Sequence, residues 1–224
     1  MSGQLTNQLC NASTLTPKTT SSQHPKPALS HTKRVTRTVR VHALASKTNA
    51  RELIRSGTVR TVRPSEAGAV IGDEGFVLLD IRPVWEREKA RVTGSVHVPL
   101  FVEDKDNGVL TLIKKWVHFG YIGLWTGQYF TTLNPDFLEK VEENVPDKTT
   151  KLLVACGEGL RSLMATTKLY EGGYKKLGWL EGGFNRSKVG DFVAIEGSEK
   201  LEYATIGGVS YIFLQLLILL RVVT

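Results

Sequence analysis

Cysteines and metal-ligand clusters are scarce in this sequence. It contains only two cysteines, Cys10 and Cys156, which excludes a disulfide-rich secreted scaffold. His97 and His118 have no cysteine or acidic cluster at metal-ligand spacing, so we expect no metal and no other cofactor. The first 51 residues also lack an apolar run of the length of a signal-peptide core, which excludes a secretory signal peptide.

Acidic residues are absent from the N-terminal segment. Eight of the 29 lysines and arginines lie in residues 1–51, which leaves 21 for the rest of the chain against all 22 acidic residues. The net charge of +7 therefore belongs to the N-terminus rather than to a folded domain. A nucleic-acid-binding face would need basic residues on the domain itself, so we do not expect one.

The composition of the same segment is typical of an organelle transit peptide. It holds fifteen serines and threonines, and its arginines begin only at residue 34, which favours a plastid over a mitochondrion. The stretch VRVHALA at 39–45 resembles a plastid processing site. We predict a transit peptide over 1–43 and a chloroplast location. The alternative is a disordered basic tail that the mature protein keeps.

A long uncharged run lies near the C-terminus. Residues 203–220 are eighteen positions without a charge, about 27 Å of helix, near the roughly 30 Å hydrocarbon thickness of a bilayer. We predict a single-pass transmembrane helix over 203–220, a prediction that Gln215 and the pair Gly207 and Gly208 weaken. The alternative is a buried C-terminal helix that covers the domain.

Between these ends, short apolar runs alternate with helical patterns. Apolar runs without polar alternation are typical of parallel strands buried on both faces. The Asn-Pro-Asp sequence at 134–136 begins a helix, and the glycine pair at 172–173 ends another over 161–171. We predict an α/β fold whose parallel sheet has strands at residues 59–62, 76–80, 96–100, 152–155 and 177–180.

Residues 101–133 do not fit this alternation. After a polar turn at 103–108 they contain a group of aromatic residues, and Gly120, Gly123 and Gly127 are expected to interrupt any long helix. The segment is either an insertion packed onto the core, or a lid or partner-facing surface near the active site or a bilayer. The aromatic residues are Trp116, Phe119, Tyr121, Trp125, Tyr129 and Phe130.

Cys156 follows the strand over 152–155, at the carboxyl end where parallel sheets bind ligands. The glycine-containing loop at 157–160 lets backbone N–H groups converge, and a helix from Arg161 adds its N-terminus behind them. This arrangement, with the charge of Arg161, is expected to favour the thiolate, the nucleophilic form of cysteine. The alternative is an inert buried cysteine.

Three motifs in the correct order resemble those of the rhodanese-like sulfurtransferases. The segment C-G-E-G-L-R-S at 156–162 resembles the family's active-site loop C-x-x-G-x-R-S. The resemblance covers residues 58–190. Upstream and downstream, the matching positions are Asp80, Arg82, Glu86, Gly94 and Pro99, then Gly173, Tyr174, Gly182 and Gly183.

The resemblance implies a single domain with a five-stranded parallel sheet, helices on both faces and a persulfide mechanism. Cys156 would be the catalytic nucleophile, taking sulfur from a small donor and passing it to a thiol or other nucleophilic acceptor. The loop's four intervening residues match the sulfurtransferases, whereas the related dual-specificity phosphatases have one more, so phosphatase or arsenate reduction is a minor alternative. The residues expected to bind the sulfur are Gly157, Glu158, Gly159, Leu160 and Arg161.

Charged residues in and near this loop lead to two further expectations. Glu158 brings a negative charge into a loop that often carries Arg or Lys in thiosulfate-active members, so we predict poor turnover of the thiosulfate dianion. Asp80, Arg82 and Glu86 are expected to form an ion-pair network that orders the fold rather than to react.

Three functions agree with these features. The first is a sulfurtransferase or persulfide carrier that uses Cys156 and is anchored to a plastid membrane. The alternative is a non-catalytic rhodanese-like module that binds a protein partner at a membrane through residues 101–133. The third is a thiol redox sensor, whose resolving thiol would come from another molecule. Replacing Cys156 by serine should abolish the first and third functions and leave partner binding.

Overall fold

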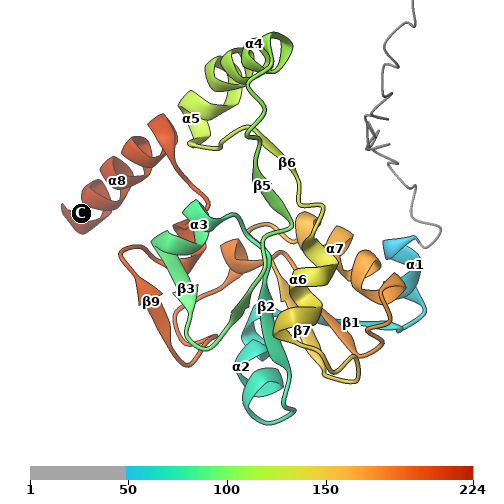
Figure 1. Cartoon of the computed structure of the whole chain (residues 1–224). Helices are drawn as coiled ribbons and strands as arrows, with labels where there is room; N and C mark the ends of the chain where they lie inside the picture. Colours follow the sequence, from blue (N-terminus) through green and yellow to red (C-terminus); the bar gives the residue numbers. More distant parts are fainter. Residues whose placement is uncertain (1–48, 224) are drawn as a thin grey trace, which may run out of the picture. The chain divides into compact units, whose positions relative to one another are not determined.

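The structure is a computed structural model that describes residues 49–223, so the transit peptide expected at 1–43 lies outside the described residues. Figure 1 shows the order of its elements. The strands are β1 Val59–Val62, β2 Val77–Asp80, β3 Ala90–Val92, β4 Val96–His97, β5 Phe101–Glu103, β6 Thr131–Leu133, β7 Leu152–Ala155, β8 Leu177–Leu180 and β9 Ile195–Gly197. The α-helices are α1 Ala50–Arg55, α2 Pro64–Gly72, α3 Val84–Lys89, α4 Val109–His118, α5 Leu124–Thr126, α6 Phe137–Asn144, α7 Leu160–Glu171 and α8 Gly208–Val223. The π-helix η1 is Phe119–Gly123, and the 3-10 helices are η2 Phe184–Arg186 and η3 Leu201–Tyr203.

The main sheet confirms the predicted architecture. Its five strands run in the order β1-β8-β7-β2-β4, and every pair is parallel. The predicted strands at 59–62, 152–155 and 177–180 have the predicted bounds, whereas 96–100 is a strand only over Val96–His97. Beyond it, the N–H groups of Val98 and Leu100 donate to the carbonyls of Asp80 and Ile81, so the chain still follows β2.

Helices cover both faces of this sheet, as predicted for strands without polar alternation. One core packs α1, α6 and α7 against the sheet through side chains such as Leu53, Phe137 and Leu169. The other packs α2 and the segments after β8 through Val70, Phe184 and residues near them. The central strand β7 is buried along its whole length, which places the residue after it inside the domain.

The segment over 101–133 leaves this domain on a two-stranded antiparallel ribbon. Its strands β5 and β6 pair Phe101 with Leu133, and Figure 1 shows them carrying α4 and α5 away from the sheet. The expectation that glycines interrupt a long helix here is wrong for Gly120 and Gly123, because α4, η1 and α5 follow one another without a break. Only Gly127, at φ 70°, ends the helical stretch.

The C-terminal apolar run forms a helix with different bounds from those predicted. Residues 203–220 are not one helix: η3 ends at Tyr203, and α8 begins only at Gly208, which has φ 57°. The sixteen residues of α8 measure about 24 Å. Within residues 49–223, no helix combines the length and the apolar character that crossing a membrane requires, so the predicted transmembrane helix is corrected.

Candidate active site

Cys156 lies directly after β7, inside the domain and without solvent exposure. Its Sγ accepts hydrogen bonds from the backbone N–H of Gly159 at 3.1 Å and of Ser162 at 3.3 Å. The Cys156 thiol also donates to the Oγ of Ser162 at 3.4 Å. Two N–H groups from the loop and from the first turn of α7 therefore converge on the sulfur, as expected for a site that stabilises negative charge.

The geometry of Gly159 directs its N–H toward the sulfur. Gly159 has φ 92°, a left-handed conformation that favours glycine. Its carbonyl is held on the other side, where it accepts from Trp179 Nε1 at 2.8 Å and from Ser162 Oγ at 2.9 Å. Trp179 belongs to β8, so the strand next to β7 fixes the orientation of the loop.

The glycine turn after β8 holds the backbone of the same loop through hydrogen bonds. The N–H of Phe184 donates to the Cys156 carbonyl, and that of Asn185 donates to the Gly157 carbonyl, each at 2.9 Å. A Cβ on Gly183 would lie 2.3 Å from both carbonyl oxygens, so only glycine fits there. The glycines at 182–183 therefore belong to the support of the active loop.

Asp80, Arg82 and Glu86 do not form the single network that we expected. Asp80 and Arg82 pair with each other, with Arg82 Nη2 at 2.7 Å from Asp80 Oδ2 and both side chains fully buried. Arg82 also donates to the Ala90 carbonyl and lies 4.4 Å above the Phe184 ring. This pair orders the chain between β2 and α3.

Glu86 instead pairs with Arg161. The two guanidinium nitrogens Nη1 and Nη2 of Arg161 lie 2.9 and 2.7 Å from the two carboxylate oxygens of Glu86. Although burial opposes the charged form, the hydrogen bonds and charge of Glu86, and to a smaller extent Cys156, raise the pKa of Arg161 above its ordinary value. Arg161 is thus a permanent cation that a buried carboxylate holds beside the loop.

A cavity of about 720 Å³ opens beside the loop. The loop contributes Glu158, Leu160 and Arg161 to its walls, and Glu86, the ion-pair partner of Arg161, also lines it. The other walls come from distant parts of the chain, namely His118, Gln128 and Tyr129 of the insertion and Thr205, Ile206 and Ser210 of the C-terminal segment. The charges of Glu86 and Arg161 cancel each other. The exposed carboxylate of Glu158 therefore gives these three residues together a net negative charge.

The insertion and the C-terminal segment are joined above this cavity. Gln128 Nε2 donates to the Thr205 carbonyl at 3.0 Å, and α5 packs against the start of α8. A Cβ on Gly208 would lie 2.3 Å from the Leu124 carbonyl, and one on Gly207 would lie 2.9 Å from the Thr126 carbonyl. We call this close approach of Gly127, Gly207 and Gly208 the glycine seam.

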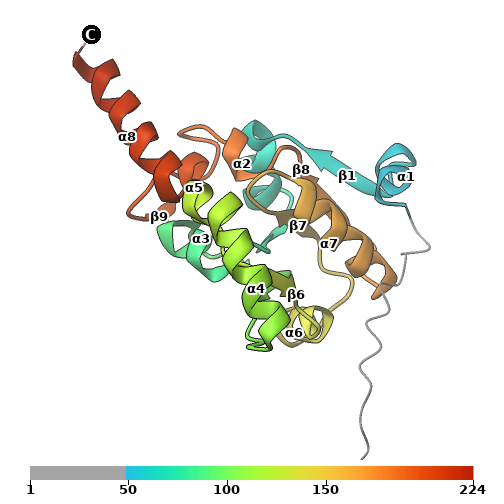
Figure 2. The ribbon, with the colours of Figure 1, turned by 90° about the horizontal axis from the view of Figure 1, so that it is seen from above.

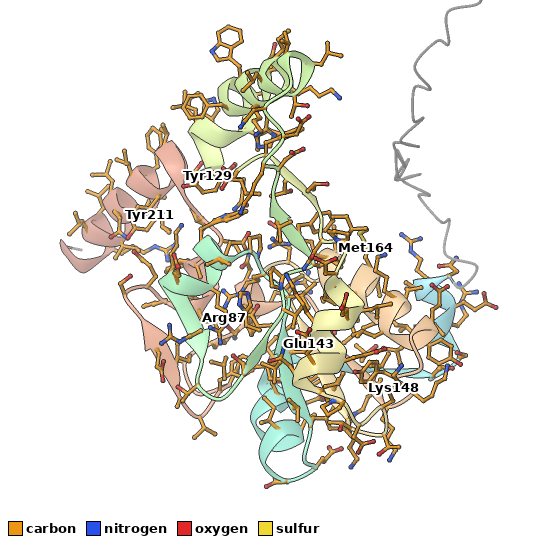
Figure 3. The ribbon with its side chains drawn as sticks, viewed as in Figure 1. Arg87, Tyr129, Glu143, Lys148, Met164 and Tyr211 are labelled. Atoms are coloured by element: carbon orange, nitrogen blue, oxygen red, sulfur yellow. The ribbon has the colours of Figure 1, made fainter. Side chains whose placement is uncertain are left out.

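Two further contacts connect the seam to the site. A Cβ on Gly157 would lie only 2.2 Å from the Thr205 methyl group, so Thr205 covers the loop directly. At the base of the insertion, the Tyr129 ring packs edge-on against Trp85 of α3, with 4.7 Å between ring centroids. Figure 3 labels Tyr129 at this junction. The insertion is therefore a wall of the candidate site.

Neither histidine lies in a metal-ligand group. His97 Nε2 is 2.8 Å from the Arg82 carbonyl, and His118 Nε2 is 3.1 Å from the Gln128 carbonyl. No group of three or more His, Cys, Asp or Glu side chains within residues 49–223 is arranged to hold a metal ion.

The comparison with known families agrees with this fold and loop. A sequence model of the rhodanese-like domain matches residues 63–188, more than half of the chain. The chain belongs to the rhodanese-like family. Its five-stranded parallel sheet and the glycine loop after β7 are thus those of a rhodanese-like domain.

Relatives in plants share this rhodanese-like region. Rhodanese-like domain-containing protein 10 of Arabidopsis thaliana is 65% identical over 175 residues, 78% of this chain and 82% of that protein. Rhodanese-like domain-containing protein 11, chloroplastic, of the same plant is 44% identical over 158 residues, 70% of this chain and 53% of that protein. Among solved structures, the rhodanese-like domain of Alr3790 from Anabaena sp. has 14% identity and a TM-score of 0.41, covering 61% of this chain and 78% of that chain.

Several residues of this rhodanese-like site were not predicted from the sequence. Trp179 and Thr205 hold or cover the loop, and Gln128 holds Thr205, through contacts between residues far apart in the chain. Ser162 matched the loop motif, but its backbone and hydroxyl contacts with Cys156 were not anticipated. The one available signal was the glycine pair at 207–208, which fits a close packing contact better than the interior of a long helix.

Proposed function

We propose that this protein is a sulfurtransferase or persulfide carrier that stores one sulfur atom on Cys156. The observation that carries the proposal is the convergence of the Gly159 and Ser162 N–H groups on Sγ, at 3.1 and 3.3 Å. Backbone N–H groups at a helix N-terminus stabilise an anion without supplying a proton-transfer group. A buried persulfide anion needs that environment.

The transfer has two balanced steps. The Cys156 thiolate attacks the transferable sulfur of an organic persulfide R–S–SH, of thiosulfate or of 3-mercaptopyruvate. The donor's S–S or C–S bond to that sulfur breaks, and the leaving thiolate, sulfite or pyruvate enolate takes the electron pair. An acceptor thiolate then attacks the outer sulfur of the cysteine persulfide, and Cys156 leaves as a thiolate. The first N–H groups of α7, at Leu160 and Arg161, have no partner within the helix, and in this proposal they bind the outer sulfur.

The cavity beside the loop supports a donor or acceptor other than thiosulfate. The Arg161 charge is engaged by Glu86, and Glu158 adds an exposed negative charge at the cavity wall. A dianion meets repulsion there, whereas a neutral or zwitterionic thiol does not. We therefore expect donors with a smaller negative charge than thiosulfate to load Cys156 better than thiosulfate does. 3-Mercaptopyruvate and organic persulfides of low charge are such donors.

We also infer a plastid location. The relatives include proteins named chloroplastic, and residues 1–43 have the acid-free, serine- and threonine-rich composition of a transit peptide. Import of a fusion of residues 1–48 to a fluorescent protein into isolated chloroplasts, with processing near residues 42–45, would test it. A fusion that stays outside the organelle would contradict it.

The competing function is a non-catalytic module that binds a protein partner through residues 101–133. The exposed aromatic residues of that segment favour it, and the complete cysteine loop opposes it. The test is sulfur transfer from a panel of donors to cyanide, followed as thiocyanate, with the full chain and Cys156→Ser. Thiocyanate formed only by the native chain supports the carrier, and no transfer from any donor by folded protein contradicts it.

A further inference from the structure

Helix α4 is amphipathic, and its polar side faces the protein. Thr111 Oγ1 donates to Asp106 Oδ2 at 2.5 Å, Lys115 Nζ donates to the Asp106 carbonyl at 2.8 Å, and His118 contacts the Gln128 carbonyl. Positions 111, 115 and 118 share one side of a helix. The loop before α4 and the chain after α5 therefore occupy its polar side.

The apolar side of α4 consequently faces outward. Val109 is 75% exposed, Ile113 54% and Trp116 78%, and these positions share the opposite side of the helix. An ordinary surface helix shows the reverse arrangement, with its apolar side against the core. No element within residues 49–223 buries this side of α4.

A second exposed apolar helix lies next to the insertion. The start of α8 packs against α5, and Figures 1 and 2 show α8 extending from that contact away from the sheet. Its exposed side chains are Ile212, Phe213, Leu216, Leu217, Leu219 and Leu220. The glycine seam joins α5 to the start of α8, and we call the exposed apolar sides of α4 and α8 together the apolar face.

The helices that carry the apolar face contain basic residues and no acidic ones, although Asp106 contacts Thr111 and Lys115 of α4, and Glu199 contacts Tyr211 of α8, from the segments before these helices. Residues 109–133 and 203–221 contain Lys114, Lys115 and Arg221 and not a single aspartate or glutamate. Trp116, Tyr121 and Trp125 are exposed on the same segment, and such amphipathic rings favour the boundary between water and lipid. Apolar helices with tryptophan on one side and lysine on the other are typical of helices that lie in a membrane interface.

We propose that the apolar face binds the surface of a bilayer containing anionic lipids, with α4 and α8 lying in the interface. Acyl chains would take up the side chains of Ile113, Trp116 and Leu217, and anionic headgroups would meet the exposed Lys114. This binding is independent of sulfur transfer at Cys156.

The test is flotation of the full chain with vesicles. Vesicles of equal parts phosphatidylcholine and phosphatidylglycerol should carry the native protein upward, and phosphatidylcholine alone should carry less. Trp116→Glu and Leu217→Glu should each lower the bound fraction about tenfold or more, because a carboxylate replaces buried apolar area. Val193→Glu is the matched control, since Val193 is 95% exposed outside the apolar face. It should bind like the native chain.

Three results would overturn the proposal. In the first, the native chain remains at the bottom of the flotation gradient with both vesicle types. Alternatively, Trp116→Glu would bind normally while Leu217→Glu did not, which would assign binding to α8 alone. Finally, light scattering would show a dimer that Trp116→Glu dissociates, without any vesicle binding. Sulfur transfer by each variant serves as the folding control, and loss of transfer in the native chain would affect only the proposed function.

Discussion

Arg161 and Glu86 form a two-point ion pair that joins the active loop to α3, across 75 positions of the chain. The Glu86 side chain is 1% exposed and that of Arg161 is 25% exposed, so water reaches only one partner. The motif glutamate upstream of the loop therefore positions the loop arginine. It does not belong to the Asp80–Arg82 pair that orders the neighbouring chain.

Removing Arg161 should therefore destabilise the domain. Arg161→Ala leaves the buried Glu86 carboxylate without its partner, which we expect to lower the free energy of unfolding by about 3 kcal/mol. The control is Arg60→Ala, because Arg60 and Glu74 form a pair whose side chains are 46% and 40% exposed. Its loss should be below about 1 kcal/mol in urea unfolding. Equal losses in the two variants would contradict the structural role of the buried pair.

Glu158 should limit the use of thiosulfate. Glu158→Gln removes the negative charge from the cavity wall, so kcat/KM for thiosulfate should rise about threefold to tenfold at low salt. The gain should shrink as salt is added, because screening weakens the repulsion that the native chain suffers. Glu143→Gln makes the same charge change on α6, outside the cavity, and should have little effect; Figure 3 labels Glu143. An unchanged thiosulfate rate in Glu158→Gln would refute the electrostatic explanation.

The glycine seam should be intolerant of side chains. Gly208→Ala introduces strain at φ 57° and a clash with the Leu124 carbonyl, whereas Gly57→Ala introduces strain at φ 74° with open space around the new Cβ. We expect Gly57→Ala to cost about 1 kcal/mol and Gly208→Ala about 2 kcal/mol more. Limited proteolysis should also cleave the insertion faster in Gly208→Ala. If the two variants unfold alike, the seam is not a packed contact.

His97 should make stability depend on pH. Burial lowers the pKa of His97, and Arg87 and Arg82 lower it further, while its contact with the Arg82 carbonyl and the charge of Asp80 oppose the shift. The folded state therefore binds a proton less readily than the unfolded state. Stability is complete above the ordinary histidine pKa of about 6.5 and is lost as pH falls through the lower folded pKa. Urea unfolding from pH 7 to pH 5 should show a smaller decline in His97→Gln, and an identical decline would exclude His97 as the cause.

The sheet and the active loop were predictable because their signals are local. Strands such as 152–155 are continuous apolar runs, and the loop motif specifies its own glycines and its own helix start. The insertion was not predictable in the same way. Gly120 and Gly123 each disfavour helix by about 1 kcal/mol, yet both are helical, because the chain around them is fixed at both ends by β5–β6 pairing and the α5–α8 contact.

The residues that complete the site depend on long-range packing. Trp179 holds the Gly159 carbonyl and Thr205 covers Gly157, and neither residue is part of a motif near Cys156. The transmembrane prediction over 203–220 failed for a similar reason: the pair Gly207 and Gly208 weakened it, but the contact that breaks the helix before Gly208 is long-range. That break exists because Gly207 and Gly208 must approach the backbone of α5.

The central claim is that Cys156 carries sulfur, and intact mass measures it directly. The full chain would be incubated with thiosulfate, 3-mercaptopyruvate or an organic persulfide, and its mass read with and without reductant. Cys156→Ser retains Cys10 and Cys10→Ser retains Cys156, so the two variants assign any added sulfur to one thiol. We predict a reducible gain of one sulfur atom in the native chain and in Cys10→Ser, and none in Cys156→Ser. Folded protein that gains no sulfur from any donor would contradict the account.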